Sequence, residues 1–413
     1  MSTHSRDGGA IISRDHLPKA QLRHYVEIDP PTAELKSVPQ GDPVTFMSLD
    51  TVWADGHADV TREMKWTGQA HSYTPFRRGD VLLPKVSPTF SMGRATVANI
   101  PHNVGLASSE VYILRPRTNV DSRFVAYAVR TSHFLDEGTA SQQGVGGLRR
   151  VSSGWVGAFN FPRYDLPTQR RIADYLDRET AQIDSMAEAL DGLVARLEER
   201  RRGLFKTATG DTRQASLAVI SRITLGKMLD GNKNKGIPTP YIRAANVERT
   251  GKIDTDDLKL MKVTPAENAT YSLRADDIIM VEGGDAGRVG YVNQDLPEIA
   301  FQKTVMRIRC HTKYSFPRYV YYALDDAHKS GRISLDYSLS TIPHFPAEKA
   351  ARLEIPLPPL EEQRRIADHL DAETAKIDAM IAKAGELRAL LDERRSALIT
   401  ATVTGQHPVP EEP

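Results

Sequence analysis

Cysteine is almost absent from this chain of 413 residues, which contains only Cys310. A single cysteine excludes an internal disulfide and a zinc site built from several cysteines, so we expect a buried, unreactive thiol. The 12 histidines show neither the HExxH spacing nor another paired spacing of metal ligands. The sequence therefore predicts no metal site and no bound cofactor on this chain.

Long apolar runs are also missing, and none comes near the roughly 18 residues that cross a membrane. The first ten residues, MSTHSRDGGA, lack the basic and apolar regions of a signal peptide. Apolar residues make up 40% of the chain and charged residues 26%, which is typical of globular proteins. We therefore expect a cytoplasmic protein without membrane contact, long enough for at least two domains.

Charge of one sign is scarce, because the net charge is only +1. Residues 1–164 contain 18 Lys and Arg against 15 Asp and Glu, and residues 211–360 contain 21 against 18. Each of these segments thus carries a small positive excess. That excess is consistent with a nucleic-acid-binding face on each segment, and an ordinary solvated surface explains it equally well.

What the sequence does contain is an internal repeat. The segment QRRIADYLDRETAQID begins at Gln169, and QRRIADHLDAETAKID begins at Gln363. When residues 169–202 are aligned with 363–396, 20 of the 34 positions are identical. Chance does not produce such agreement, so the same structural element is expected twice.

Each copy reads as a long helix. Apolar residues step by three and four positions with charged residues between them, which is the pattern of a coiled-coil seam. Pro167 and Pro359 suit a first helical turn, and the glycines of TATG and TVTG suit a helix end. We predict helices over residues 165–210 and 358–405, each roughly 60 Å long, which pair as an antiparallel coiled coil. The predicted seam consists of Ile183, Met186, Leu190, Leu193, Leu197, Ile377, Met380, Ala384, Leu387 and Leu391. The alternative is that each helix packs on its own neighbouring domain.

The segments between the helices repeat more faintly. FRRGDVLL (76–83) matches LRADDIIM (273–280), and RFVAYAV (123–129) matches RYVYYAL (318–324), whereas the intervening loops differ. Short apolar runs bounded by Gly, Pro and Asp predict strands. The predicted fold class is therefore α+β: two pseudo-repeated mixed α/β domains, residues 1–164 and 211–357, joined by the two long helices, with residues 406–413 as a disordered tail. Two copies of one scaffold with dissimilar loops suggest related readings of different targets.

In its repeat and its two-domain organisation the chain resembles the specificity subunit of type I restriction-modification systems. The most specific match is IPLPPLEEQRRIADHLDAETAKID (355–378), with further likeness at YIRAANV (241–247), RADDIIMVEGGDAGRVG (274–290) and SLSTIPHF (338–345). The resemblance covers nearly the whole chain: a variable target recognition domain, a helix, a second variable domain and a second helix. One departure is expected at the N-terminus, where the first 35 or so residues lack an opening like SLAVISRITLGKML (216–229).

The resemblance implies that each recognition domain reads one half of a split DNA site, with the coiled coil as a ruler between the halves. It also implies two methyltransferase subunits and the restriction (motor and nuclease) subunits as partners of this chain on double-stranded DNA. S-adenosylmethionine, ATP and Mg²⁺ would be bound by those partners. The modified atom would be N6 of adenine.

Residues that could contact DNA are Arg, Lys, Asn, Gln and small polar residues in loops or beside strands. In the first domain the candidates are Lys85, Ser87, Arg94, Asn99 and Asn103. In the second they are Asn232, Lys233, Asn234, Lys235, Arg243, Asn246, Arg288, Gln302 and Lys303. For each of them, an ordinary turn or surface charge is an equally good interpretation.

Catalysis on this chain is not expected. DPPT (29–32) has Thr32 where an adenine methyltransferase needs an aromatic residue, and the glycine runs lack the Lys-Ser/Thr of a P-loop. The alternative to a DNA reader is a coiled-coil scaffold whose end domains bind proteins. Such a scaffold would bind its partners without the steep salt dependence of DNA contacts.

Overall fold

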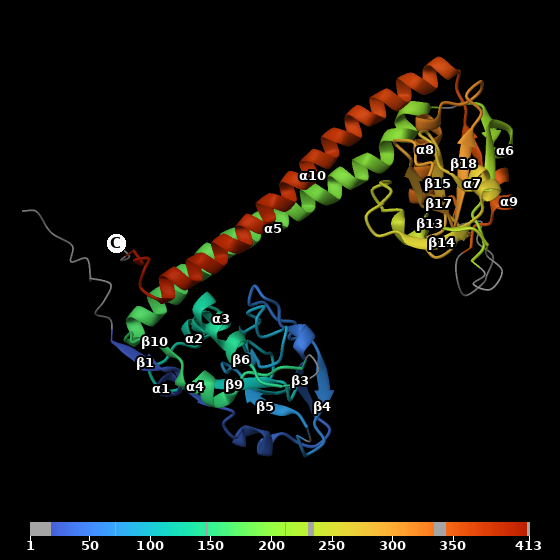
Figure 1. Ribbon diagram of the computed structural model, residues 1–413. Coiled ribbons are helices and arrows are strands. Elements are labelled where there is room, and N and C mark those ends of the chain that lie inside the picture. The colour runs from blue at the N-terminus through green and yellow to red at the C-terminus, as the bar shows by residue number, and fades with distance from the viewer. Residues whose placement is uncertain are drawn as a thin grey trace, which may run out of the picture. The chain divides into compact units, whose positions relative to one another are not determined.

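The computed structural model describes residues 18–70, 72–144, 148–210, 212–229, 235–333 and 344–410. It divides into two compact units, residues 1–190 with 386–413 (unit 1) and residues 191–385 (unit 2). Each unit holds one α/β domain and half of each long helix (Figure 1). The units thus cut both helices in the middle, whereas the sequence-based division set the helices apart from the domains.

Unit 1 is built on two four-stranded sheets. The first has the order β2 (Val26–Ile28), β9 (Val111–Pro116), β6 (Val81–Pro84), β7 (Thr96–Val97), and the second β4 (Glu63–Lys65), β3 (Pro43–Met47), β8 (Val104–Ala107), β5 (Thr74–Arg77). A separate pair joins β1 (Lys19–Gln21) to β10 (Asn160–Pro162). The helices are α1 (Leu22–Tyr25), η1 (Ala33–Ser37), η2 (Leu49–Thr51), α2 (Ser122–Ala128), α3 (Ser132–Ser141) and α4 (Ser153–Ala158).

Unit 2 repeats this plan. Its four-stranded sheet has the order β12 (Ser221–Leu225), β18 (Val305–Cys310), β15 (Ile278–Val281), β16 (Val289–Tyr291), and a three-stranded sheet has the order β14 (Lys259–Val263), β13 (Ile237–Ile242), β17 (Ala300–Phe301). The separate pair is β11 (Gln214–Ser216) with β19 (Glu354–Pro356). The helices are α6 (Leu217–Ile220), η3 (Ala244–Asn246), α7 (Pro265–Tyr271), α8 (Pro317–Lys329) and α9 (Ala347–Arg352). The predicted α+β class with two related domains is therefore confirmed.

The central strands explain why both domains fold alike. All four residues of β6 and all four of β15 are buried, which requires apolar side chains on both faces of the strand. The sequences VLLP and IIMV supply them. The loops between these strands lie outside this constraint and can differ.

The N-terminal opening corrects one expectation. A short strand, one helical turn and a second strand (β1, α1, β2) stand at the start of unit 1, as β11, α6 and β12 do in unit 2. Leu22 and Tyr25 are buried in the same way as Leu217 and Ile220. The opening is therefore present in both domains. The sequence of the first domain did not reveal this opening, because a four-residue helix between three-residue strands needs only two apolar residues.

The long helices are α5 (Leu166–Thr209) and α10 (Leu360–Val403). In unit 1, Arg395 of α10 forms an ion pair with Asp184 of α5. In unit 2, Arg201 of α5 forms the equivalent pair with Asp378 of α10, with Nη1 2.6 Å from Oδ1. In each unit, a residue from the first half of one helix thus contacts a residue from the second half of the other, which confirms antiparallel pairing. Each helix also packs on its domain, since Ile172 and Leu370 belong to the two domain cores.

The predicted seam is partly wrong. Ile183, Leu197, Ile377 and Ala384 are buried, and Leu190, Leu193 and Leu391 are half-buried. Met186, Met380 and Leu387 are instead 52%, 49% and 42% exposed. The buried residue after Ile183 is Ala187, one position further on. Steps of three and four both return near the same helix face, so the larger methionine suggested the wrong register, whereas the small alanine fits the close helix contact.

Candidate nucleic-acid interface

Each domain is held to its long helix by the same contacts. In unit 1, the Tyr127 hydroxyl donates to Asp177 Oδ1 at 2.7 Å, and Arg123 Nη1 lies 2.7 Å from Asp177 Oδ2. In unit 2, the Tyr322 hydroxyl donates to Asp371 at 2.6 Å, and Arg318 Nε donates to the same oxygen at 2.7 Å. Burial raises the pKa of Tyr127 and of Tyr322 to about 12, so both hydroxyls remain donors at neutral pH.

The first residue of the repeated segment is a clamp between helix and domain. Gln363 is fully buried, and its side-chain oxygen accepts from Phe316 N at 2.8 Å. Its amide donates to the carbonyls of Pro358 (2.8 Å) and Tyr314 (3.1 Å). In unit 1, Gln169 accepts from Asp121 N at 3.0 Å and donates to Tyr164 O at 2.9 Å. The repeat therefore encodes the attachment of each domain as well as the helix pair.

The candidate residues of the first domain differ in how far their side chains are already engaged within the domain. Lys85 and Ser87 are half-buried and partly engaged: Lys85 Nζ lies 4.8 Å from the centre of the Tyr112 ring, and Ser87 Oγ donates to Gln142. Arg94 is half-buried, and its Nε has no hydrogen-bond partner in the described part of the chain. Asn99 and Asn103 are exposed. The two asparagines and Arg94 are thus the side chains that remain available for a ligand.

Three candidates of the second domain gather around the backbone of Ala244. Arg288 Nη2 donates to Ala244 O at 3.0 Å, and Ala244 N donates to Thr304 Oγ1 at 3.2 Å. Thr304 in turn donates to Gln302 Oε1 at 3.0 Å. Arg243 precedes Ala244 and lies 3.3 Å from Asp257 Oδ2. This network brings Arg243, Arg288 and Gln302 together on one edge of unit 2.

Asn246 has a structural role, which corrects its assignment as a DNA contact. It is only 2% exposed, and it accepts from Arg243 N at 3.2 Å and donates to Asp257 O at 3.1 Å. Both ends of its amide are therefore used within the domain. Lys235 and Lys303 are exposed. Asn232, Lys233 and Asn234 lie outside the described residues.

Two buried ion pairs escaped the sequence analysis. Arg115 holds Asp80 through contacts of 2.9 and 2.8 Å, and Arg309 holds Asp277 through contacts of 2.7 and 2.6 Å. Each carboxylate is 1% exposed. The pairs occupy corresponding places. Arg115 lies on β9 and Arg309 on β18, and each aspartate lies just before the neighbouring strand, β6 or β15. Alternating residues on a strand do not reveal which charges will meet, so only the fold identifies them.

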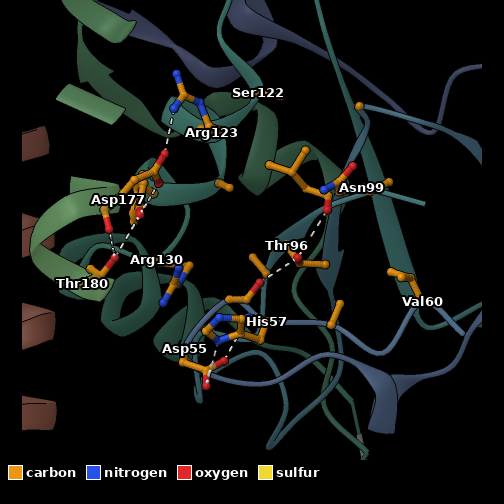
Figure 2. Close-up of a pocket in the computed structure, with 18 of the residues that line it drawn as sticks. Asp55, His57, Val60, Thr96, Asn99, Ser122, Arg123, Arg130, Asp177 and Thr180 are labelled. Carbon is orange, nitrogen blue, oxygen red and sulfur yellow. Dashed lines mark hydrogen bonds and ion pairs between the residues drawn. The ribbon is translucent and has the colours of Figure 1, made fainter. Parts of the chain in front are cut away.

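Unit 1 also contains a cleft of about 690 Å³ that the sequence did not suggest. It lies between the domain and α5, and its lining includes His57, Asn99, Arg130, Asp177 and Thr180 (Figure 2). Arg78 also lines it. Asn99 is the one predicted contact residue in this lining. Arg130 could not have been singled out, because it ends the apolar run VAYAVR, where a core residue is the natural expectation.

Among the described residues, no group of three or more His, Cys, Asp or Glu side chains could hold a metal ion. Within the same residues, no helix is both long and apolar enough to cross a membrane. Cys310 is half-buried, and burial raises the pKa of its thiol to about 12.

Comparison with known proteins gives consistent matches. Residues 219–387 match the family described as "Type I restriction modification DNA specificity domain". The specificity subunit of the EcoAI type I restriction enzyme of Escherichia coli is 23% identical over 276 residues, which are 60% of this chain and 45% of that protein. The EcoEI specificity subunit, also from E. coli, is 20% identical over 49% of this chain and 39% of its own length. The matched region is thus less than half of either relative.

Solved structures show the same fold over almost the whole chain. One comes from work on complex assembly and conformational transition of the type I R-M system; it covers 94% of this chain and 98% of its own, with a TM-score of 0.75 and 15% identity. Another is the HsdS subunit from Thermoanaerobacter tengcongensis, which covers 94% and 97% with a TM-score of 0.55 and 16% identity. Two repeated domains, each attached to the long helices, are thus the fold that this chain shares with these solved structures. Residues 219–387 thus resemble the type I specificity-domain family, and the chain is similar to type I restriction-modification specificity subunits.

Proposed function

We propose that this chain reads a split, asymmetric DNA site, with one half-site for each α/β domain. The observation that carries the proposal is the repetition of one scaffold with different loops. The strands, the attachment contacts of Tyr127 and Tyr322 and the buried ion pairs recur, whereas the residues between them differ. A conserved frame with varied loops is how one fold reads two different sequences.

In this proposal the paired helices set the distance between the half-sites. A helix rises 1.5 Å per residue, so one inserted heptad adds roughly 10 Å. Since base pairs of B-DNA rise about 3.4 Å, that insertion corresponds to about 3 base pairs. A heptad added at matching positions of α5 and α10 should lengthen the recognised spacer accordingly. An unchanged spacer in a folded variant would contradict the role of the helices as a ruler.

The chemistry belongs, in this proposal, to partner subunits. Two methyltransferase subunits would dock on this chain and methylate adenine N6, and restriction subunits would join them as motor and nuclease. S-adenosylmethionine, ATP and Mg²⁺ would be bound by those subunits. The chain itself would have no catalytic activity and would act on double-stranded DNA in the cytoplasm.

The test is to coexpress the chain with its methyltransferase subunit in a host that lacks DNA methylation and to map modified adenines by single-molecule sequencing. A motif of two defined halves with a fixed spacer is expected. A complex that copurifies but methylates no motif would favour the scaffold instead. Salt dependence separates the two further, because DNA contacts weaken steeply as salt rises and contacts between proteins need not.

A further inference from the structure

The cleft of unit 1 has the features of a small-molecule binding site. Its volume of about 690 Å³ is in the range of small-molecule pockets, roughly 300 to 1,000 Å³. One wall is the face of α5 that carries Asp177 and Thr180, and Val60 and Asn99 lie across the cleft from it (Figure 2). The lining includes charged side chains, the amide of Asn99 and aliphatic side chains.

Arg130 is the charged group at the centre of this cleft. It is only 8% exposed, and among the described residues its guanidinium donates one hydrogen bond, from Nη2 to the carbonyl of Ala54 at 3.0 Å. Its Cζ also lies 5.7 Å from the centre of the Tyr127 ring. The chain makes room for it, because a side chain at Gly56 would approach Arg130 Nη1 to 2.5 Å. Burial lowers the pKa of Arg130 to about 10, so the group is still a cation at neutral pH.

Two acidic residues of the cleft are paired with other arginines, and the charge of Asp55 favours the cationic form of Arg130 without forming an ion pair with it. Asp177 pairs with Arg123 at 2.7 Å, Asp184 pairs with Arg395, and Asp55 lies 3.3 Å from His57. Among the described residues, no carboxylate forms an ion pair with Arg130. A nine-tenths buried cation without an anion is costly unless a ligand supplies one.

Unit 2 offers an internal comparison. The residue that corresponds to Arg130 is Asp325, which forms an ion pair with Lys329 at 2.7 Å. A hollow of about 20 Å³ beside Tyr322 and Thr374 is lined by the end of α5, including Arg201 and Phe205, and not by domain loops. The attachment contacts are shared by the two units, but the buried cation is not. Arg130 therefore serves a purpose other than attachment.

The burial of Arg130 also limits what can enter. A DNA duplex is too wide to bring a phosphate to a guanidinium that is 8% exposed, whereas a small molecule can reach it. Arg78 adds a second cation to the lining, next to Asn99, since Gly79 N donates to Ala98 O at 3.0 Å. Val60 and Val97 supply an apolar surface on the same side.

We propose that this cleft binds a small organic phosphate of the size of a nucleoside monophosphate. Arg130 holds the phosphate by charge-assisted hydrogen bonds. The organic part lies against Val60 and Val97, within reach of the Asn99 amide. Asn99 is also a candidate DNA contact, but the proposal does not depend on the proposed function.

Titration calorimetry on the full chain tests it, with inorganic phosphate and the four nucleoside 5′-monophosphates as probes. At least one nucleotide is expected to bind more tightly than inorganic phosphate. Arg130→Gln should weaken that binding about tenfold or more, as expected for loss of a charged hydrogen bond. Ala181→Trp should also abolish it, because Ala181 is exposed on α5 and its enlarged side chain would fill the cleft.

The matched control is Ala375→Trp. Ala375 is the counterpart of Ala181 in the second copy of the repeat and is exposed on α10, so nucleotide affinity should be unchanged. Because Arg130→Gln could unfold the domain, the Ala181→Trp variant is decisive, and circular dichroism checks the fold of all three. The proposal is overturned if no nucleotide binds, if inorganic phosphate binds as tightly as the nucleotides, or if Ala181→Trp binds like the unmodified chain. Loss of copurification with the methyltransferase subunit in Ala181→Trp, without nucleotide binding to the unmodified chain, would instead identify the cleft as a socket for that protein.

Discussion

Tyr322 donates a hydrogen bond of 2.6 Å to Asp371, and so joins the second α/β domain to the long helix α10. The same carboxylate accepts from Arg318, so one side chain of the helix holds two of the domain. Tyr127 and Asp177 make the equivalent contact in unit 1. The attachment of domain to helix is therefore a repeated device, and its strength can be measured.

Removing the Tyr322 hydroxyl should destabilise unit 2. In Tyr322→Phe the ring is kept and Asp371 loses one donor, so the free energy of unfolding should fall by about 1 to 2 kcal/mol. Chemical denaturation followed by circular dichroism measures this change. Tyr314→Phe is the control, because Tyr314 is 52% exposed and should unfold like the unmodified chain. Equal stability of the two variants would show that the contact contributes nothing.

The corrected seam can be tested at two adjacent residues of α5. Ala187 is 5% exposed and Met186 is 52% exposed. Ala187→Lys buries a charge between the helices and should cost about 2 to 4 kcal/mol. Met186→Lys points into solvent and should change stability by less than about 1 kcal/mol. If the methionine variant were the less stable of the two in thermal unfolding, the originally predicted register would be the right one.

Stability should fall on mild acidification because of His328. Burial lowers the pKa of this imidazole below its ordinary value of 6.5, although Asp285, 3.4 Å from Nε2, acts in the opposite direction. The folded state therefore favours the neutral ring. The contribution of the neutral His328 ring to stability is complete above pH 6.5 and is lost as the pH falls through the lowered pKa of the folded state.

The melting temperature between about pH 7.5 and 5 measures this effect. His328→Gln should flatten the decrease, because the substituted side chain takes up no proton. His311→Gln, at an exposed histidine, should keep the profile of the unmodified chain. Identical profiles for His328→Gln and the unmodified chain would assign the acid sensitivity to other groups.

Lys303 and Lys235 provide a test of phosphate contacts in the second domain. Both are exposed, so alanine substitution should leave the fold intact. Each substitution should weaken DNA binding by the assembled complex about equally for all sequences and reduce the salt slope by roughly 1. Band-shift titrations at several salt concentrations measure the slope. Lys262→Ala, also exposed on β14, is the comparison, and a slope equal to that of this variant would exclude a phosphate contact.

Periodic features of this protein were accessible from the sequence. The spacing of Ile183, Leu197, Ile377 and Ala384 predicts paired helices, because a heptad pattern depends only on distances along the chain. The two copies of the repeat indicate the antiparallel arrangement by their order alone. Composition and short apolar runs predict the α/β domains, since a fully buried strand such as β6 requires consecutive apolar residues.

Features that depend on which distant residues meet were not accessible. Asn246 reads as a DNA contact in the sequence and is a buried cap in the structure, because its partner Asp257 lies eleven residues away across a turn. The sequence pattern assigns Met186 to the coiled-coil seam, whereas the structure buries Ala187 there. A one-residue shift barely changes the periodicity, so the pattern cannot separate the two.

The sequence by itself determined the repeat, the long helices and the likeness to type I specificity subunits, since these follow from local order and from the identity of residues. Only the tertiary structure decided that Arg130 is buried beside a cleft without an ion pair among the described residues, while its counterpart Asp325 is paired with a lysine. The physical reason is that desolvation and ion pairing depend on the three-dimensional surroundings of a charge, which residue spacing does not specify.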